Sequence, residues 1–302
     1  MKYCDVGEVR ASRVIVGCMR IADKPLRQVE KIIIEALKAG ANTFDHADIY
    51  GKGDSETVFG VAVKDLGLKR EDFILQSKCG IRQGYYDFSR EHILSSVENS
   101  LKRLNSEYLD VLLLHRPDTL MEEDEVCEAF NKLQSDGKVR AFGVSNFSPA
   151  QIALLRSAGI KISANQVQFS LMQSALVDEG LNVNTQKAEA VDRTGGLLEY
   201  CRLHKIRLQA WSPLSYGFME GVFVGNEKFP ALNTCLFRLA EKYGVSPATI
   251  AIAWILRHPA CMQAVVGSTT PERIAELCKA AEVRLSREEW YELYRATGKT
   301  LP

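Results

Sequence analysis

Short apolar runs alternate with longer amphipathic segments along the whole chain, and this alternation restricts the possible folds more than any other feature. Several of the runs are continuously apolar, as in strands that are covered on both faces. Eight strands are predicted, over residues 14–17, 42–45, 73–77, 109–114, 139–144, 162–167, 207–211 and 263–266. Strands that alternate with helices form a parallel sheet, so the chain belongs to the α/β class.

The segments between these strands have helical periodicity and recognisable start signals. Ser148, Ser246 and Thr270 each precede a proline, which combines a capping side chain with the residue favoured at the first helical position. Helices are expected over residues 27–39, 54–66, 90–104, 122–135, 149–157, 195–204, 247–257 and 271–280.

Eight strands that are each followed by a helix predict a (β/α)8 TIM barrel, with an open doubly wound sheet as the alternative. Four pieces lie outside the eightfold pattern: a hairpin at 2–10, segments at 168–194 and 214–242, and a last helix near 286–297. The prediction is therefore a barrel with an N-terminal β-hairpin and extra C-terminal helices. Because the chain contains no linker, low-complexity tract or repeat, residues 1–302 are expected to form a single domain.

The composition excludes several classes of partner and location. Lys+Arg and Asp+Glu both number 38, so the zero net charge attracts neither nucleic acid nor an anionic membrane. No segment approaches the roughly 18 apolar residues of a membrane span, and the N-terminus does not resemble a signal peptide. The eight scattered cysteines are typical of a reducing cytoplasm, and neither they nor the five histidines have metal-ligand spacing.

Ionisable side chains follow three successive predicted strands. Asp45 and Tyr50 come after the second strand, Lys78 ends the third, and His115 follows the fourth. In a barrel these strand ends meet at one rim, where active sites are built. An acid, a phenol, an amine and an imidazole are thus expected to converge there.

Seven stretches of the sequence resemble the aldo-keto reductase family. They follow the order and spacing of the family over nearly the whole chain, and they are closest to a bacterial-type oxidoreductase branch that carries DHADIYG and HRPD. The stretches are FDHADIYG at 44–51, SKCG at 77–80, LLLHRPD at 112–118, GKVRAFGVSNFSPAQ at 137–151, NQVQFS at 165–170, AWSPL at 210–214 and GSTTPERI at 267–274.

The resemblance implies NADPH-dependent reduction of an aldehyde or ketone, a small-molecule carbonyl, with Asp45, Tyr50, Lys78 and His115 as the catalytic residues. Hydride goes from the nicotinamide to the carbonyl carbon, and Tyr50 supplies the proton. Lys78 is expected to favour the phenolate and so bring the pKa of Tyr50 from about 10 towards the working range. Asp45 would keep Lys78 charged, and His115 would orient the carbonyl oxygen.

A dinucleotide-binding G-x-G-x-x-G motif is absent, so the cofactor residues are those that the resemblance implies. Ser145, Asn146 and Gln166 match the carboxamide site, and Trp211 matches the ring that stacks on the nicotinamide. The remaining matches are Ser212, Leu214 and Gly217 for the pyrophosphate, Gly267, Ser268, Thr269 and Arg273 for the 2′-phosphate, Glu276 for the adenine, and Met19. Met19, Tyr85, Tyr86 and Phe218 are also candidate walls of the substrate pocket.

The sequence departs from the family at Gly267, where many members have a basic residue, and at Leu277, where many have an asparagine. Arg273 is then the one expected cation of the phosphate pocket, and NADH remains an alternative cofactor. The short connection after Asp118 and the end of the chain at Pro302 predict an open pocket.

Two other functions remain as alternatives. A lyase would use Lys78 as a Schiff-base nucleophile, which Asp45 opposes by keeping the amine charged. A nicotinamide-binding regulatory module would bind cofactor with little turnover. The protein is expected to be a monomer or a weak homo-oligomer.

Overall fold

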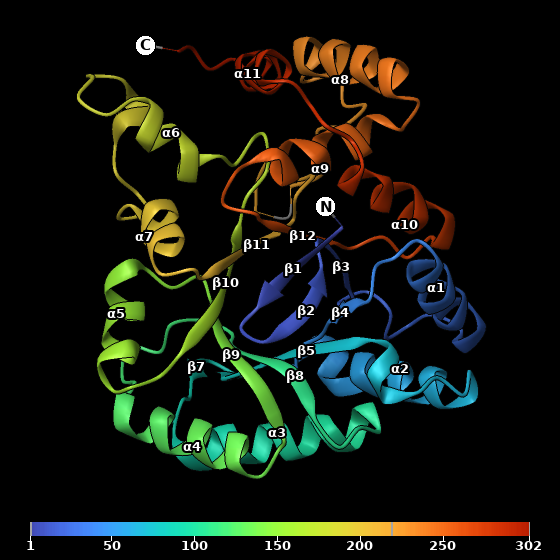
Figure 1. The fold of residues 1–302 in the computed structure, drawn as a ribbon, viewed down its shortest axis with the longest axis vertical. Helices are drawn as coiled ribbons and strands as arrows, with labels where there is room; N and C mark the ends of the chain where they lie inside the picture. The colour runs from blue at the N-terminus through green and yellow to red at the C-terminus, as the bar shows by residue number, and fades with distance from the viewer. Residues whose placement is uncertain (1, 219, 302) are drawn as a thin grey trace.

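Eight parallel strands form a closed barrel in the computed structural model, which describes residues 2–218 and 220–301 (Figure 1). Each strand pairs with the next along the chain, and the last pairs with the first, so the open-sheet alternative is wrong. The barrel strands are β3 (Val14–Gly17), β4 (Thr43–Asp45), β5 (Ile74–Cys79), β8 (Leu109–Leu114), β9 (Val139–Ser145), β10 (Ile162–Gln168), β11 (Arg207–Trp211) and β12 (Gln263–Val266).

A helix follows each barrel strand and covers the outside of the barrel, as the sequence predicted (Figure 1). The predicted bounds of strands and helices are correct to within two residues. The eight helices are α1 (Leu26–Lys38), α2 (Asp54–Asp65), α3 (Arg90–Leu104), α4 (Glu123–Ser135), α5 (Pro149–Ser157), α7 (Leu197–Leu203), α9 (Pro247–Arg257) and α10 (Pro271–Cys278).

Two of the three expected helix caps form. The Oγ atom of Ser148 accepts the N–H of Gln151, and that of Ser246 accepts the N–H of Thr249. The expected cap by Thr270 is wrong, because its side chain makes no capping hydrogen bond and its own N–H is bound by Ser268 Oγ at 3.1 Å. The first N–H groups of α10 are therefore left without a side-chain cap.

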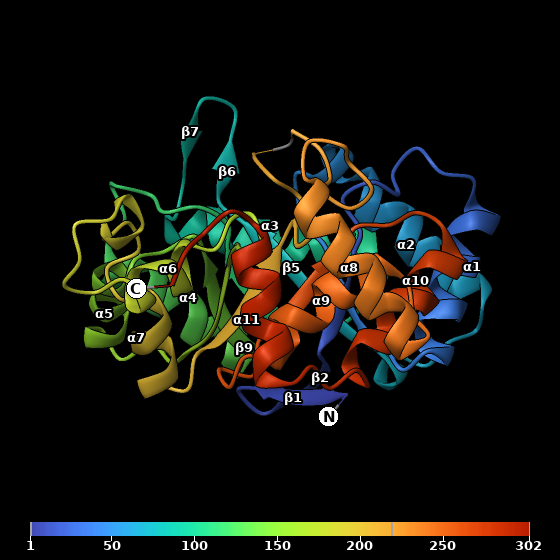
Figure 2. The ribbon, with the colours of Figure 1, turned by 90° about the horizontal axis from the view of Figure 1, so that it is seen from above.

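Two hairpins lie at opposite ends of the barrel (Figure 2). The predicted one, β1 (Tyr3–Val6) and β2 (Val9–Ser12), closes the end where the strands begin and packs Val6, Val9 and Ala11 on the barrel interior. The other, β6 (Ile81–Arg82) and β7 (Tyr85–Tyr86), projects from the end where the strands finish, and the sequence did not predict it.

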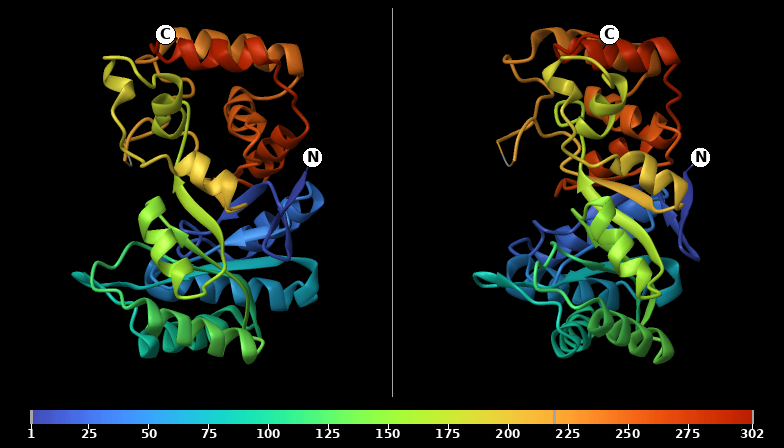
Figure 3. Two further views of the ribbon diagram at one scale, coloured as in Figure 1. Left: turned by 60° about the vertical axis from the view of Figure 1, so that its left-hand side comes forward. Right: turned by 90° about the vertical axis from the view of Figure 1, so that its left-hand side faces the viewer.

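Three further helices complete the fold. The segment at 168–194 contains α6 (Ala175–Leu181), and the segment at 214–242 leads into α8 (Pro230–Tyr243), a helix that the sequence did not predict. The expected last helix is α11 (Arg287–Ala296), which lies beside α8 (Figure 3). Within the described ranges, no helix is both long enough and apolar enough to cross a bilayer.

Buried glutamines from three strands form a hydrogen-bonded chain through the barrel interior. Gln76 Nε2 donates to Gln209 Oε1 at 2.9 Å, and Gln209 Nε2 donates to Gln263 Oε1 at 3.0 Å. Gln263 Nε2 then donates to the carbonyl oxygen of Ser12 at 2.8 Å, at the hairpin end of the barrel. Buried amides need hydrogen-bond partners, and these glutamines supply them to one another inside the barrel.

Helices α2 and α3 approach each other closely at Gly60, which is buried. A Cβ atom added there would lie 2.4 Å from the carbonyl oxygen of Arg103 and 2.7 Å from the carbonyl carbon of Leu104. Both are backbone atoms, so a side chain could be accommodated only by moving the two helices apart.

We therefore expect Gly60→Ala to lower the free energy of unfolding by roughly 2–3 kcal/mol through overpacking. Gly180→Ala is the matched control, because Gly180 is an exposed helical glycine with only an ordinary 3.8 Å contact. Its replacement should raise stability by about 0.5–1 kcal/mol. Denaturant unfolding measures both changes, and an equal effect of the two substitutions would contradict the close approach.

Candidate active site

A cavity of about 490 Å³ opens where the barrel strands end. Its lining combines polar groups from several strand ends with apolar side chains from the loops that follow them. The predicted catalytic residues Asp45, Tyr50 and His115 all line it. The convergence expected from the sequence is therefore present in the structure.

Lys78 joins three of the predicted catalytic residues to one another from inside the barrel wall. It lies on the same inner face as Gln76, because residues two apart in a strand share a face. Its Nζ atom donates to Asp45 Oδ2 at 2.6 Å, to the carbonyl oxygen of His46 at 2.7 Å and to Tyr50 Oη at 3.2 Å. All three ammonium hydrogens are thus directed at oxygen atoms.

Asp45 is held from its other side by amides. Its Oδ1 atom accepts hydrogen bonds from Gln76 Nε2 at 2.6 Å and from Gln166 Nε2 at 2.9 Å. Both glutamines are buried, so the carboxylate has polar partners at each oxygen although it lies in the core. The ion pair with Lys78 is therefore fixed in position and direction.

For Lys78 and for Tyr50, burial and the neighbouring charge shift the pKa in opposite directions. Burial opposes the charge of Lys78, but Asp45 and then Tyr50 outweigh it and raise the lysine pKa. Burial also raises the pKa of Tyr50, by more than Lys78 lowers it. The expectation that its neighbours bring the Tyr50 pKa towards neutrality is wrong for this structure, because desolvation of the phenolate dominates. Tyr50 is consequently a protonated phenol at neutral pH.

His115 faces Tyr50 across the cavity, with ring centroids 5.9 Å apart and ring planes at 81°. Burial lowers the pKa of His115 well below its usual value, and the charges of Lys78 and Arg116 lower it further. Its Nδ1 atom has no hydrogen-bond partner among the described residues. The imidazole is therefore neutral, with one N–H that can be donated.

Most of the expected cofactor residues share this cavity. The polar side chains of one cluster bind each other, since Trp211 Nε1 donates to Asn146 Oδ1 at 3.0 Å and Asn146 Nδ2 donates to Ser145 Oγ at 2.8 Å. The expected residues that line the cavity are Met19, Ser145, Asn146, Gln166, Trp211, Ser212, Leu214, Gly267, Ser268 and Arg273.

Three expected cofactor residues lie outside the lining. The carbonyl oxygens of Gly217 and Thr269 accept hydrogen bonds from glutamine side chains. The carboxylate of Glu276 accepts the N–H of Ser246 and pairs with Lys279 at 2.5 Å. These contacts give each residue a structural partner within the fold.

Sequence reasoning missed two arginines of the cavity. Arg20 donates through Nη2 to the carbonyl oxygen of Gly267 at 2.5 Å, and the Arg116 guanidinium lies 5.7 Å from the centre of the Trp211 ring. Arg273 is therefore not the one cation of the pocket. Both missed residues come shortly after strand ends, which was the available signal.

Apolar side chains form the walls of the cavity. Met19 and Phe218 line it as expected, together with Ile49, Ile81 and Val222. Tyr85 and Tyr86 are exposed on β7 and do not line it. An apolar pocket is thus present, and residues other than the two tyrosines form its walls.

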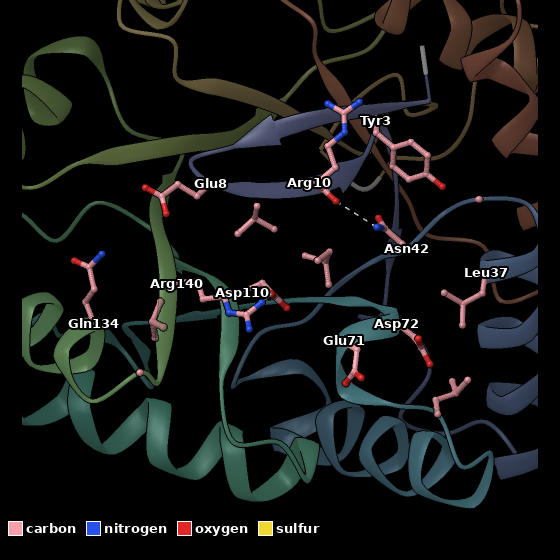
Figure 4. A pocket seen from close by; sticks show the side chains of 16 residues that line it. Tyr3, Glu8, Arg10, Leu37, Asn42, Glu71, Asp72, Asp110, Gln134 and Arg140 are labelled. Atoms are coloured by element: carbon pink, nitrogen blue, oxygen red, sulfur yellow. Dashed lines mark hydrogen bonds and ion pairs between the residues drawn. The ribbon is translucent and has the colours of Figure 1, made fainter.

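A larger cavity, of about 1080 Å³, lies at the opposite end of the barrel beneath the β1–β2 hairpin (Figure 4). Some of its polar side chains are engaged in the fold: Asp110 pairs with Arg140 at 3.2 Å, and Asn42 Nδ2 donates to the carbonyl oxygen of Arg10. In the part of the chain that the structure describes, no group of three His, Cys, Asp or Glu side chains could hold a metal ion. The predicted catalytic residues lie at the other end of the barrel, in the cavity where the strands finish.

Comparisons with known proteins agree with this site. A model of the Aldo/keto reductase family matches residues 13–296. The chain is 36% identical to oxidoreductase YdhF of Escherichia coli, over 94% of this chain and 93% of that protein, and 34% identical to a 6-dehydroglucose reductase of Agrobacterium fabrum, over 97% and 96%. A crystal structure of an aldo-keto reductase from Klebsiella pneumoniae in complex with NADPH aligns with a TM-score of 0.75 and 25% identity, over 95% of this chain and 92% of that one. The chain is therefore an oxidoreductase that belongs to the aldo/keto reductase family, as its motifs predicted.

Proposed function

We propose that this protein reduces a small aldehyde or ketone to an alcohol with NADPH and that Tyr50 donates the proton. The observation that carries the proposal is the contact between Tyr50 Oη and Lys78 Nζ at 3.2 Å, in the cavity that His115 also lines. When bound, NADPH supplies the hydride that the carbonyl carbon receives. The residues of the chain must then stabilise and protonate the carbonyl oxygen.

Tyr50 and His115 share the work at that oxygen. Negative charge develops there, and the phenol O–H and the N–H of a neutral imidazole are the donors that face it. After proton transfer, the Tyr50 phenolate is stabilised by the buried ammonium of Lys78. Asp45 keeps that ammonium charged and in place through their contact at 2.6 Å.

The same ion pair argues against the lyase alternative. A Schiff-base lysine must lose its proton before it attacks a carbonyl. The pKa of Lys78 is raised by Asp45 and Tyr50 despite burial, and its three hydrogens are engaged. Lys78 is better suited to supporting Tyr50 than to acting as a nucleophile.

The cavity fits NADPH at both ends. Ser145, Asn146 and Trp211 would hold the nicotinamide beside Tyr50. At the other end, Ser268, Arg20 and Arg273 lie where α10 begins, and the uncapped N–H groups of that helix favour an anion. Two guanidinium groups suit a phosphate on the adenosine, and the similar Klebsiella pneumoniae structure is a complex with NADPH.

Replacing Tyr50 by phenylalanine removes the proposed acid and leaves the ring in place. We expect kcat/KM for a panel of aldehydes and ketones, with 6-dehydroglucose included, to fall about 10²–10⁴-fold, the usual contribution of a general acid. NADPH affinity should be unchanged. NADPH oxidation is followed by the absorbance of the reduced nicotinamide, and cofactor affinity by fluorescence titration.

Tyr86→Phe is the control, because Tyr86 is exposed on β7 and outside the cavity. It should keep full activity. Tight NADPH binding without turnover in the unmodified protein would instead favour the regulatory module. An absence of binding would refute the proposed function.

The reductive reaction should lack an ionisation near pH 6.5. His115 has its pKa lowered, so it stays neutral as the pH falls through 6.5, the usual value for histidine. Tyr50 has its pKa raised above 10, so it stays protonated until strongly alkaline pH. The profile of kcat/KM is thus expected to be flat from about pH 6 to pH 9 and to fall above 10. A limb centred near pH 6.5 that disappears in His115→Gln would contradict the neutral imidazole.

Arg20→Gln and Arg273→Gln should each weaken NADPH binding about 10–100-fold, because each removes a charged hydrogen bond of roughly 1.5–3 kcal/mol. NADH lacks the 2′-phosphate, so its affinity should change much less. Arg82→Gln is the control, since Arg82 lies on β6 and outside the cavity lining. Equal losses for NADPH and NADH would mean that these arginines do not read the 2′-phosphate.

A further inference from the structure

One arginine of the candidate active-site cavity has no part in the reaction proposed above. Arg116 follows β8 and comes directly after His115, and both residues line the cavity that Tyr50 also lines. The other two arginines of the lining, Arg20 and Arg273, lie where α10 begins and are assigned to the phosphate of the adenosine. Arg116 is therefore a cation of the cavity that neither the cofactor nor the proton transfer explains.

The guanidinium of Arg116 contacts the ring of Trp211, which ends β11. Its centre lies 5.7 Å from the centre of the ring, within the range of a cation–π contact. Such a contact uses the positive charge over the face of the ring and leaves the N–H groups at the edge of the guanidinium able to donate. Across residues 2–218 and 220–301, Arg116 makes no hydrogen bond and no ion pair. Its donors are thus directed at no acceptor of the described chain.

The acids that could neutralise Arg116 are already engaged. Asp118, two residues further along the chain, accepts the N–H of Phe88 through Oδ2 at 3.1 Å and the N–H of Leu120 through Oδ1 at 2.9 Å. Among the described residues that line the cavity, Asp45 is the one acid, and both of its oxygens are held by the contacts described above. The half-buried guanidinium is therefore available to an anion that enters the cavity.

The surroundings of Arg116 suit one kind of anion. The planar fork of a guanidinium matches the two oxygens of a carboxylate, and its single positive charge neutralises a single negative charge. A phosphate dianion would need a second cation, and the other two arginines of the lining lie at the α10 end. Apolar side chains form the adjacent walls, namely Met19, Ile49, Ile81, Phe218 and Val222. A carboxylate on a short apolar body fits both features.

We propose that Arg116 selects carbonyl substrates that bear a carboxylate, by pairing with that group while the carbonyl oxygen faces Tyr50 and His115. This inference rests on the proposed function, and it narrows the substrate class to oxo acids, that is, aldehydes or ketones with a carboxylate in the same molecule. Arg116 takes no part in the transfer of hydride or proton. Its contribution therefore depends on the charge of the substrate, and a neutral substrate of the same shape does not receive it.

The test compares acids with their uncharged methyl esters as substrates of the whole protein with NADPH. The pairs are glyoxylate, succinic semialdehyde and para-carboxybenzaldehyde, each with its ester, because the distance between carboxylate and carbonyl increases along this series. We expect kcat/KM of the unmodified protein to be about tenfold or more higher for the acid in at least one pair, as for a charged hydrogen bond. Arg116→Gln should remove this preference through a higher KM for the acid.

The ester reports whether the variant is folded, since Arg116→Gln should leave its kcat/KM and the NADPH affinity unchanged. Arg116→Lys keeps the charge without the fork and should retain part of the preference. Arg82→Gln is the control, because Arg82 is exposed on β6 and outside the cavity lining. It should keep the full preference for the acid.

Three outcomes would overturn the role of Arg116 and leave the proposed reduction intact. They are equal values for acid and ester in every pair, equal losses for acid and ester in Arg116→Gln, and a loss of NADPH affinity in that variant. The second outcome would limit Arg116 to supporting Trp211, and the third would assign it to the cofactor. An unmodified protein that reduces neither member of any pair would contradict the proposed function itself, and this inference with it.

Discussion

The buried ion pair between Lys78 and Asp45 is the interaction on which the site depends. Removing either charge from water costs several kcal/mol, and the cost is offset only when the partners are close and every remaining polar atom is bound. Here Lys78 Nζ lies 2.6 Å from Asp45 Oδ2, and the other two ammonium hydrogens are donated to the His46 carbonyl oxygen and to Tyr50 Oη. The requirement for a complete set of partners thus places Tyr50 in the cavity. An apolar residue at position 78 could not make the hydrogen bond that holds Tyr50 in this position.

The order of elements and the meeting of the candidate catalytic residues at one rim were predictable because both are encoded locally. Strands covered on both faces produce unbroken apolar runs, and β11 and β12 begin and end at the predicted residues. Asp45, Lys78 and His115 could be placed on one rim because parallel barrel strands all finish at the same end. The family motifs suggested the roles that we propose for these residues, which their position alone does not specify.

The features that were missed depend on contacts between distant parts of the chain. The pKa of Tyr50 is raised because the phenol is buried, and the extent of its burial cannot be deduced from the spacing of residues in the sequence. Arg20 follows a strand end, but its contact with Gly267 joins residues 247 positions apart, so the local sequence does not place it at the α10 end of the cavity. Thr270 is a residue type that commonly caps helices, but its side chain makes no capping hydrogen bond, and its own N–H donates to Ser268 Oγ. Helix α8 lies in the segment at 214–242, which the sequence analysis placed outside the eightfold pattern without predicting a helix there.

The chain of glutamines through the barrel has a consequence for how sequences of this kind can diverge. Each end of the chain is an acceptor that cannot donate, the Asp45 carboxylate at one end and the Ser12 carbonyl at the other. The amides of Gln76, Gln209 and Gln263 between them are therefore oriented by both ends at once. Replacing one of these amides by an acid or an apolar side chain would leave the neighbouring amides buried without a hydrogen-bond partner. Substitution at these three positions therefore requires coordinated changes on several strands. The loops that follow the strands can instead change one residue at a time.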